Sequence, residues 1–398
     1  MKTHRITFLK ICLFTMLGLA GAALCRGQDS GVIKVVKNYD VLGNSPPILV
    51  SLEGLTGEAA EVLKFDLYVQ GFSFVAPDAA QYQITGSGTE NIEGRVTDRV
   101  SKRMILTRSY NGGSLRRQAH AFADEIVQAI TQRKGIGLTK VAFKVQKPSG
   151  NGEIYVADFD GHNPQEVTHD NTIVAAPAWA PGRLVIYYDS YKLNNPDVWY
   201  HNLSTGQRRV IAHYSGSNIS PAVSPDGSKV AMILSKSGSP NLWISDADGS
   251  NLKQLSRSAE DESSPCWSPD GRWICFATKI AERRVLAKVP ADGGPIQRIP
   301  TAGAPNPTEP DWSPDGKWIA FTSQAGDFNI CVMPADGSQP PTVITAGEDP
   351  SWSPNSRTLI FTHRNGWHYS LSVLDVFTKQ VKDIARVSGN DSQPAWAR

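Results

Sequence analysis

The sequence predicts an α+β N-terminal domain followed by an all-β six-bladed β-propeller that is closed by N- and C-terminal strands. Three observations predict this fold: a short repeated phrase, an incomplete set of strands at each end of the repeats, and a different hydrophobic period before them. The phrase is Trp-Ser-Pro-Asp-Gly or a close variant, and its copies begin at Trp179, Val223, Trp267, Trp312 and Trp352. A period of about 40–45 residues built from short strands indicates one propeller blade per repeat.

Each repeat predicts a blade of four strands. A strand leads into Ser-Pro-Asp-Gly, which favours a tight turn because Pro fixes φ and Gly accepts φ > 0. Residues 318–322 then predict a second strand and residues 329–333 a third. An Asp-Gly pair, as at Asp336-Gly337, predicts the hairpin into the fourth strand.

The two ends of the repeat region predict how the ring closes. Residues 140–168 supply the second, third and fourth strands of a blade without a first strand. Residues 393–398 read as a first strand with no other strand after it. Combining the two completes a sixth blade and removes the exposed sheet edges.

Residues 28–138 predict a small mixed α/β domain, and residues 139–398 the propeller. Apolar positions at helical spacing predict a helix over 57–70 and a second helix from the N-cap Ser114 to Lys134. Gly135-Ile-Gly137 ends the second helix. The predicted strands cover residues 32–37, 47–52, 72–75, 81–85 and 104–108.

Residues 1–27 predict an export signal, with a basic start and an apolar stretch over 11–24 that is shorter than a membrane span of about 20 residues. We therefore expect no membrane span. Lipidation at Cys25 is an alternative, although Leu24 is larger than the residue that usually precedes a lipidated cysteine. Cleavage after Gly27 removes four basic residues and no acidic ones, changing the formal net charge from +2 to −2. With no basic stripe, the sequence does not predict a nucleic-acid partner.

Three cysteines follow the signal region: Cys266, Cys275 and Cys331. Their number is odd and no Cys-x-x-Cys pair occurs, which favours buried free thiols. Cys266 and Cys275 flank one hairpin, so a cross-strand contact between them is the alternative.

Three segments resemble the TolB family of periplasmic proteins: residues 65–74, 115–124 and 135–142. The resemblance extends from the signal region to Arg398. It implies a non-enzymatic periplasmic protein of the Tol–Pal system that supports outer-membrane integrity and constriction at cell division. It also implies two partners: a Pal-type peptidoglycan-associated lipoprotein at one mouth of the propeller channel, and TolA-type inner-membrane proteins through the N-terminal part.

The candidate partner-binding residues lie in two regions. In the propeller, the loops that enter each first strand and the loops between second and third strands rim one channel mouth. Rim loops are also polar simply because water reaches them. The rim candidates are Asn218, Glu262, Glu309, Glu348, Asp349, Asp391, Arg283, Arg284, His363 and Arg364. By resemblance, residues 28–36 form a switch between partners, and their apolar residues Val32, Ile33, Val35 and Val36 are suited to docking as an added strand.

Other residues have structural interpretations. The repeated tryptophans predict packing between blades. His120 and Asp124, one helical turn apart, predict a side-chain hydrogen bond or a domain contact, because two ligands do not make a metal site. We expect no cofactor, no metal and a monomer.

Two other functions remain open: an envelope scaffold with a different partner, and a metal-dependent propeller lyase acting on acidic sugars. The lyase would need several histidines in the channel. No nucleophile elbow, phosphate loop or zinc-binding helix motif supports an enzyme. The lyase candidates are His162, His169, His201, His213, His363 and His368.

Overall fold

The computed structural model describes residues 42–43, 45–384 and 387–398. The predicted signal segment 1–27, Cys25, the strand over 32–37 and the switch residues Val32, Ile33, Val35 and Val36 lie outside the described residues.

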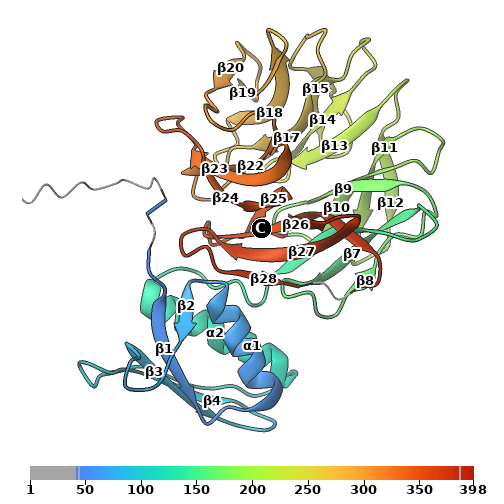
Figure 1. The fold of residues 1–398 in the computed structure, drawn as a ribbon. Coiled ribbons are helices and arrows are strands. Elements are labelled where there is room, and N and C mark those ends of the chain that lie inside the picture. Colours follow the sequence, from blue (N-terminus) through green and yellow to red (C-terminus); the bar gives the residue numbers. More distant parts are fainter. Residues whose placement is uncertain (1–41, 44, 385–386) are drawn as a thin grey trace, which may run out of the picture. The chain divides into compact units, whose positions relative to one another are not determined.

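The N-terminal domain is a five-stranded mixed sheet with two helices (Figure 1). The strand order is β2-β1-β3-β4-β5, with β1 parallel to both β2 and β3 and the remaining pairs antiparallel. Leu63 and Leu67 of α1 and Phe122 of α2 are fully buried in its core. The elements are β1 (Ile48–Glu53), α1 (Gly57–Tyr68), β2 (Phe72–Phe74), β3 (Tyr82–Ser87), β4 (Glu93–Asp98), β5 (Met104–Ser109) and α2 (Leu115–Thr131).

The predicted N-cap of α2 is confirmed, because the Ser114 hydroxyl accepts a hydrogen bond from the Arg117 N–H at 3.2 Å. One strand of the sheet, β4, was not predicted from the sequence. Its inward-facing positions include Gly94, which lies directly against the Phe122 ring, so a residue with no side chain occupies a core position. The hydrophobic alternation that identifies a strand is weakened there.

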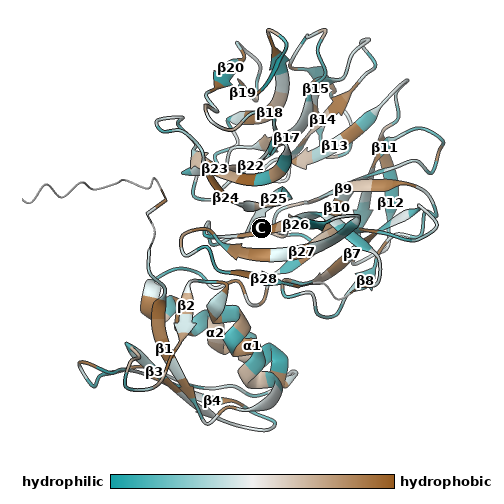
Figure 2. Ribbon diagram, in the orientation of Figure 1, coloured by the Kyte–Doolittle hydropathy of each residue, from teal (hydrophilic) through white to brown (hydrophobic). Residues whose placement is uncertain are grey.

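The predicted six-bladed propeller is confirmed: six four-stranded antiparallel sheets form within the described residues. Figure 2 shows hydrophobic residues along the strands and mainly hydrophilic residues at their connections. The first three blades are β9 (Val174–Trp179), β10 (Val185–Ser190), β11 (Asp197–Asn202) and β12 (Arg208–Ala212); β13 (Asn218–Val223), β14 (Lys229–Leu234), β15 (Asn241–Asp246) and β16 (Lys253–Gln254); and β17 (Ser263–Trp267), β18 (Trp273–Ile280), β19 (Arg283–Pro290) and β20 (Gln297–Ile299). The next two are β21 (Pro307–Trp312), β22 (Trp318–Ala325), β23 (Asp327–Pro334) and β24 (Thr342–Ala346); and β25 (Glu348–Trp352), β26 (Thr358–Asn365), β27 (His368–Asp375) and β28 (Val381–Asp383).

The sixth blade confirms the predicted closure. Its strand order is β29-β6-β7-β8, so its first strand comes from the C-terminal side of the repeats and the other three from the N-terminal side. Asp391 pairs with Val145 and Trp396 with Val141. The strands are β29 (Asn390–Trp396), β6 (Lys140–Gln146), β7 (Gly152–Asp158) and β8 (Gln165–Glu166).

The ring has two mouths, which follow from the strand directions. We call the end where chain segments enter each first strand, and where second strands turn into third strands, the entry mouth. The opposite end, which carries the Ser-Pro-Asp-Gly turns and the hairpins between third and fourth strands, is the turn mouth.

The N-terminal domain contacts the propeller at the turn mouth. The Val69 carbonyl accepts a hydrogen bond from the Thr358 hydroxyl at 3.1 Å, and the Gln380 amide donates to the Phe72 carbonyl at 3.0 Å. Phe65 packs against Phe159, with ring centroids 5.8 Å apart. These contacts leave the entry mouth on the other side of the ring.

Candidate functional site

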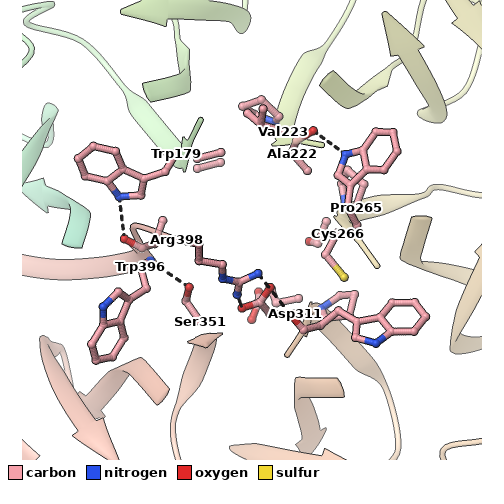
Figure 3. Close-up of a pocket in the computed structure, with 18 of the residues that line it drawn as sticks. Trp179, Ala222, Val223, Pro265, Cys266, Asp311, Ser351, Trp396 and Arg398 are labelled. Atoms are coloured by element: carbon pink, nitrogen blue, oxygen red, sulfur yellow. Dashed lines mark hydrogen bonds and ion pairs between the residues drawn. The ribbon is translucent and has the colours of Figure 1, made fainter. Parts of the chain in front are cut away.

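A cavity of about 530 Å³ occupies the propeller channel (Figure 3). First strands of all six blades line it, and each contributes an Xaa-Pro pair. The pairs are Ala176-Pro177, Ser220-Pro221, Ser264-Pro265, Glu309-Pro310, Asp349-Pro350 and Gln393-Pro394.

The residue before each of these prolines has a left-handed backbone, with φ between 49° and 56°. The pairing register between first and second strands shifts at the same point in every blade. Such a β-bulge changes the direction in which side chains point. A left-handed backbone is uncommon for residues other than glycine. The repeated bulge therefore gives the channel wall its shape.

Side chains at three of these bulges hydrogen-bond to the next blade. The Glu309 carboxylate accepts from the Asp349 N–H at 3.1 Å, and the Asp349 carboxylate accepts from the Gln393 N–H at 3.2 Å. The Gln393 side-chain oxygen in turn accepts from the Ala176 N–H at 3.1 Å. At the following junction, Asp189 of β10 accepts from the Ser220 N–H at 3.0 Å. Each bond satisfies a backbone donor that the bulge removes from the strand ladder.

The carboxyl groups on one side of the channel perturb one another. Burial raises the pKa of Asp349 well above its usual value, and the neighbouring Glu309 and Glu348 add to the shift. Burial, followed by Glu309, also raises the pKa of Glu348. Like charges held close together disfavour ionisation. This side of the channel therefore favours a cationic group or partial protonation.

Towards the turn mouth, Arg398 at the C-terminal end of the chain contacts residues of two other blades. The Arg398 guanidinium pairs with the Asp311 carboxylate (Figure 3) and donates to the Trp352 carbonyl at 3.2 Å. Asp311 also accepts from the Trp352 N–H at 2.7 Å. Burial raises the pKa of Asp311, while Arg398 and these hydrogen bonds oppose the shift.

The repeated tryptophans pack between blades, as predicted. Trp179 donates its indole N–H to the Ala395 carbonyl at 3.1 Å, Trp267 to Ala222 at 2.9 Å and Trp352 to Asp311 at 3.2 Å. In each case the acceptor belongs to the preceding blade. All five repeated tryptophans are buried: Trp179, Trp267, Trp312, Trp352 and Trp396.

The structure separates the rim candidates into three groups. Glu309 and Asp349 line the channel cavity, with the half-buried Glu348 beside them. Four basic residues lie at or beside the hairpins of the entry mouth: Arg283, Arg284, His363 and Arg364. Arg364 stacks over Phe328 and Tyr369, with its guanidinium carbon 5.7 and 5.4 Å from the two ring centroids.

Asn218, Glu262 and Asp391, which were predicted to meet a partner at the rim, are instead buried, because all three are at most 2% exposed. The Asn218 amide donates to the Tyr214 carbonyl at 2.9 Å, and the Glu262 carboxylate accepts from the Leu242 N–H at 2.8 Å. Burial raises the pKa of Asp391 to about 7. Asn218 and Glu262 therefore hold the entering loops in place from within.

The histidines proposed for a lyase do not gather in the channel. Within the described residues the cavity lining contains no histidine. His162 lies beside Asp160, His169 beside Glu166 and His213 beside Asp197, while His201 is buried in β11. His363 and His368 lie on β26 and β27 near the entry mouth. Among the described residues, no group of three or more His, Cys, Asp or Glu side chains is arranged to hold a metal ion.

Two features of the site were missed in the sequence. The proline two positions before each repeated Trp or Val marks the channel wall, and this signal was present in every repeat. Trp367, at the hairpin between β26 and β27, is 89% exposed. Its exposure distinguishes it from the buried repeated tryptophans. The only sign of this exposure in the sequence is the position of Trp367 at a hairpin.

The fold and site define a six-bladed propeller with a proline-lined channel. The TolB beta propeller domain family matches residues 127–398, and the chain belongs to this family. The crystal structure of TolB from Acinetobacter baumannii has the same fold, with a TM-score of 0.80 and 22% identity over 89% of this chain and 97% of that one.

Curated relatives match over shorter stretches. A protein of Desulfosudis oleivorans named Tol-Pal system protein TolB is 32% identical over 39% of this chain and 37% of its own length. A protein of the same name from Chromobacterium violaceum is 36% identical over 33% of this chain and 31% of its own length. The matched region therefore spans about a third of these relatives.

Across the described part of the chain, no helix has the length and apolar character needed to cross a bilayer.

Proposed function

We propose that this chain is a non-enzymatic periplasmic component of a Tol–Pal system. In this proposal a Pal-type peptidoglycan-associated lipoprotein binds at the entry mouth, and TolA-type inner-membrane proteins bind through the N-terminal part, including residues 28–36. The complex would support outer-membrane integrity and constriction at division. The proposed organisation is a signal segment over 1–27, a small domain over 28–138 and a propeller over 139–398. We also propose that the protein acts as a monomer.

The observation that carries the proposal is an exposed aromatic and guanidinium rim at the entry mouth. Trp367 is 89% exposed, and Arg364 lies on an adjacent strand, stacked between rings of two blades. Trp, Tyr and Arg are the residues most enriched where partners bind tightly. An exposed indole close to a stacked guanidinium offers a partner a large contact area with both apolar and polar character.

The charge arrangement gives the partner a chemical description. The rim presents Arg283, Arg284 and Arg364, and the channel side beneath it presents Glu309, Glu348 and Asp349. A complementary partner would present acidic residues around a central basic or neutral projection. The domain contacts lie at the turn mouth, so a partner at the entry mouth does not compete with them.

Calorimetric titration with the periplasmic domain of a Pal lipoprotein from the same organism tests the proposal. We expect Arg364→Glu to weaken binding about tenfold or more, because it reverses a charge stacked in the rim. The matched control is Arg272→Glu at the turn mouth, whose side chain is also exposed. This control should bind like the unaltered chain.

Each result has a defined meaning. If Arg272→Glu weakens binding and Arg364→Glu does not, the partner binds at the turn mouth. If the unaltered chain does not bind at high micromolar concentrations, the Tol–Pal assignment fails. The envelope scaffold with another partner then becomes the leading function, to be pursued by affinity capture.

A further inference from the structure

A buried cluster of ionisable side chains lies where the N-terminal helices meet the propeller. We call it the joint cluster, and it consists of Asp66 of α1, Arg116, His120 and Asp124 of α2, and Asp160 in the turn between β7 and β8. Asp66, His120 and Asp160 are each at most 3% exposed. Ionisable groups are rarely buried this deeply unless they are paired.

A series of short contacts connects the two domains across their contact surface, which we call the joint. A 2.6 Å hydrogen bond joins His120 Nδ1 to Asp66 Oδ2, and His120 Nε2 lies 3.6 Å from Asp160 Oδ2. The Arg116 guanidinium pairs with the same Asp160 carboxylate. His120 therefore sits between a carboxylate of its own domain and a carboxylate of the propeller.

The glycines after α2 allow this close packing. The Asp124 carboxylate accepts from the Gly137 N–H at 2.7 Å. A Cβ atom at Gly137 would lie 2.9 Å from Asp66 Oδ2, and one at Gly135 would overlap the Asp124 side chain. The segment that connects the two domains is thus packed directly against the cluster.

The cluster has more negative charge than its partners neutralise. Without counting His120, the three carboxylates and Arg116 sum to two net negative charges at this buried contact. Within the described residues, Asp66 Oδ1 and His120 Nε2 have no hydrogen-bond partner. Among the described residues, the other charged or titratable groups facing the cluster include Glu58 beside Arg116, the Asp158–Lys140 pair, and His162 beside Asp160.

Burial raises the pKa of Asp66 to about 6, and its hydrogen bond to His120 only partly opposes the shift. Burial also raises the pKa of Asp124. Both shifts come from removing a charge from water without full compensation.

We propose that the joint cluster is a proton-operated clamp, in which uptake of one proton by Asp66, at its hydrogen bond to His120, tightens the contact between the N-terminal domain and the propeller. The added proton lowers the buried negative charge from two to one. It also allows the pair to keep its hydrogen bond without an uncompensated carboxylate. Acidification from neutral to mildly acidic pH therefore favours the closed joint.

The direction follows from proton linkage. When the joint opens, Asp66 reaches water and its pKa returns towards 3.8, so the closed state binds more protons between pH 4 and 6. Stability of the joint is therefore highest at the acidic end of this window and falls as pH rises through about 6. From pH 7.5 to 5.5 the equilibrium should shift about fourfold towards the closed joint.

Hydrogen exchange of the full chain tests the clamp without any partner. Exchange is followed for peptides covering residues 132–140 and 158–165 at pH 7.5 and 5.5, and each rate is divided by the intrinsic rate at that pH. We expect about fourfold more protection at pH 5.5 in the unaltered chain. Asp66→Asn, which is neutral at both values, should show no such change.

The control is Asp78→Asn, an exposed position in the same domain with the same charge change. It should respond to pH like the unaltered chain. Equal protection at both pH values in the unaltered chain, or an unchanged response in Asp66→Asn, would overturn the proposal. If Asp66→Asn does not fold, carboxyl NMR of the unaltered chain decides: titration of Asp66 near 6 supports the clamp, and titration near 4 excludes it.

Discussion

The six channel residues in the left-handed conformation show how one residue position shapes the site. A residue before proline normally avoids helical backbone regions, so a left-handed conformation at this position is costly. The cost is offset where Glu309, Asp349 and Gln393 each accept a backbone N–H from the next blade. The same side chains then carry the charge and polarity of the channel.

The cysteines give a residue-scale prediction. Burial raises the pKa of Cys331 to about 11, and burial together with the Cys275 thiol raises the pKa of Cys266 well above its usual value. We expect native Cys331 to react with iodoacetamide at pH 7.5 at least roughly a hundredfold more slowly than a free thiol, because the thiolate is the nucleophile. Mass spectrometry of alkylated peptides measures this.

The matched sample for the thiol experiment is the same chain in guanidinium, where all three cysteines should react. Rapid modification of Cys331 in the native chain would show that this part of the core opens readily. The structure already shows all three thiols free and buried, as the sequence predicted.

At the scale of elements, the Ser-Pro-Asp-Gly turn is the best-specified unit in the chain. In β13–β14 the Ser224 hydroxyl donates to Asp226 at 2.6 Å and accepts from the Lys229 N–H at 2.9 Å. Asp226 also accepts from the Ser228 N–H at 3.0 Å. The carboxylate thus organises the turn, which explains why Asp or Asn recurs there.

These turns predict a pH dependence opposite to that of the joint cluster. Hydrogen bonds from Ser224 and Ser228 lower the pKa of Asp226 to about 2. A lowered pKa contributes stability above pH 3.8, which is lost as pH falls towards 2. We expect Asp226→Asn to lose less stability than the unaltered chain between pH 5 and pH 2.5, measured by urea unfolding.

The control for the turn experiment is again Asp78→Asn, an exposed position outside the repeated Ser-Pro-Asp-Gly turns. It should lose as much stability as the unaltered chain. If Asp226→Asn lost just as much, the Asp226 carboxylate would contribute nothing to the turn in the folded state.

Most elements could be predicted from the sequence because their signals are local. The repeated turn, the Ser114 cap and the helical spacing of residues 115–130 each depend on neighbours in the chain. β4 could not be predicted, because its buried position Gly94 lies against the Phe122 ring, which leaves no room for a side chain there. This contact is between residues far apart in the sequence. The burial of Glu262 and Asp391 likewise depends on contacts that no local pattern reports.

At the scale of the whole molecule, closure of the ring depends on β29. Trp396 stacks against Phe159 with ring centroids 5.9 Å apart and donates its indole N–H to the Thr139 hydroxyl at 2.8 Å. It therefore anchors the closing strand to the blade that begins the propeller.

Two tryptophan substitutions test the importance of this closure. Trp396→Ala removes a side chain that is 3% exposed, and we expect it to lower the free energy of unfolding by about 3–5 kcal/mol. Trp367→Ala removes the same side chain from a position that is 89% exposed and should change stability by less than about 0.5 kcal/mol. Equal losses in urea unfolding would mean that β29 does not hold the ring closed.

The pairing of β29 with β6 also sets the order in which the molecule can be finished. Five blades are continuous in sequence and can form as each repeat emerges, but Lys140–Gln146 must wait for Asn390–Trp396. Until then β6 presents an unpaired strand edge, which can pair with another chain. We expect newly made chains to be most prone to aggregation before Asn390–Trp396 has been synthesised. We also expect chaperones that protect these chains to bind the unpaired edge of β6.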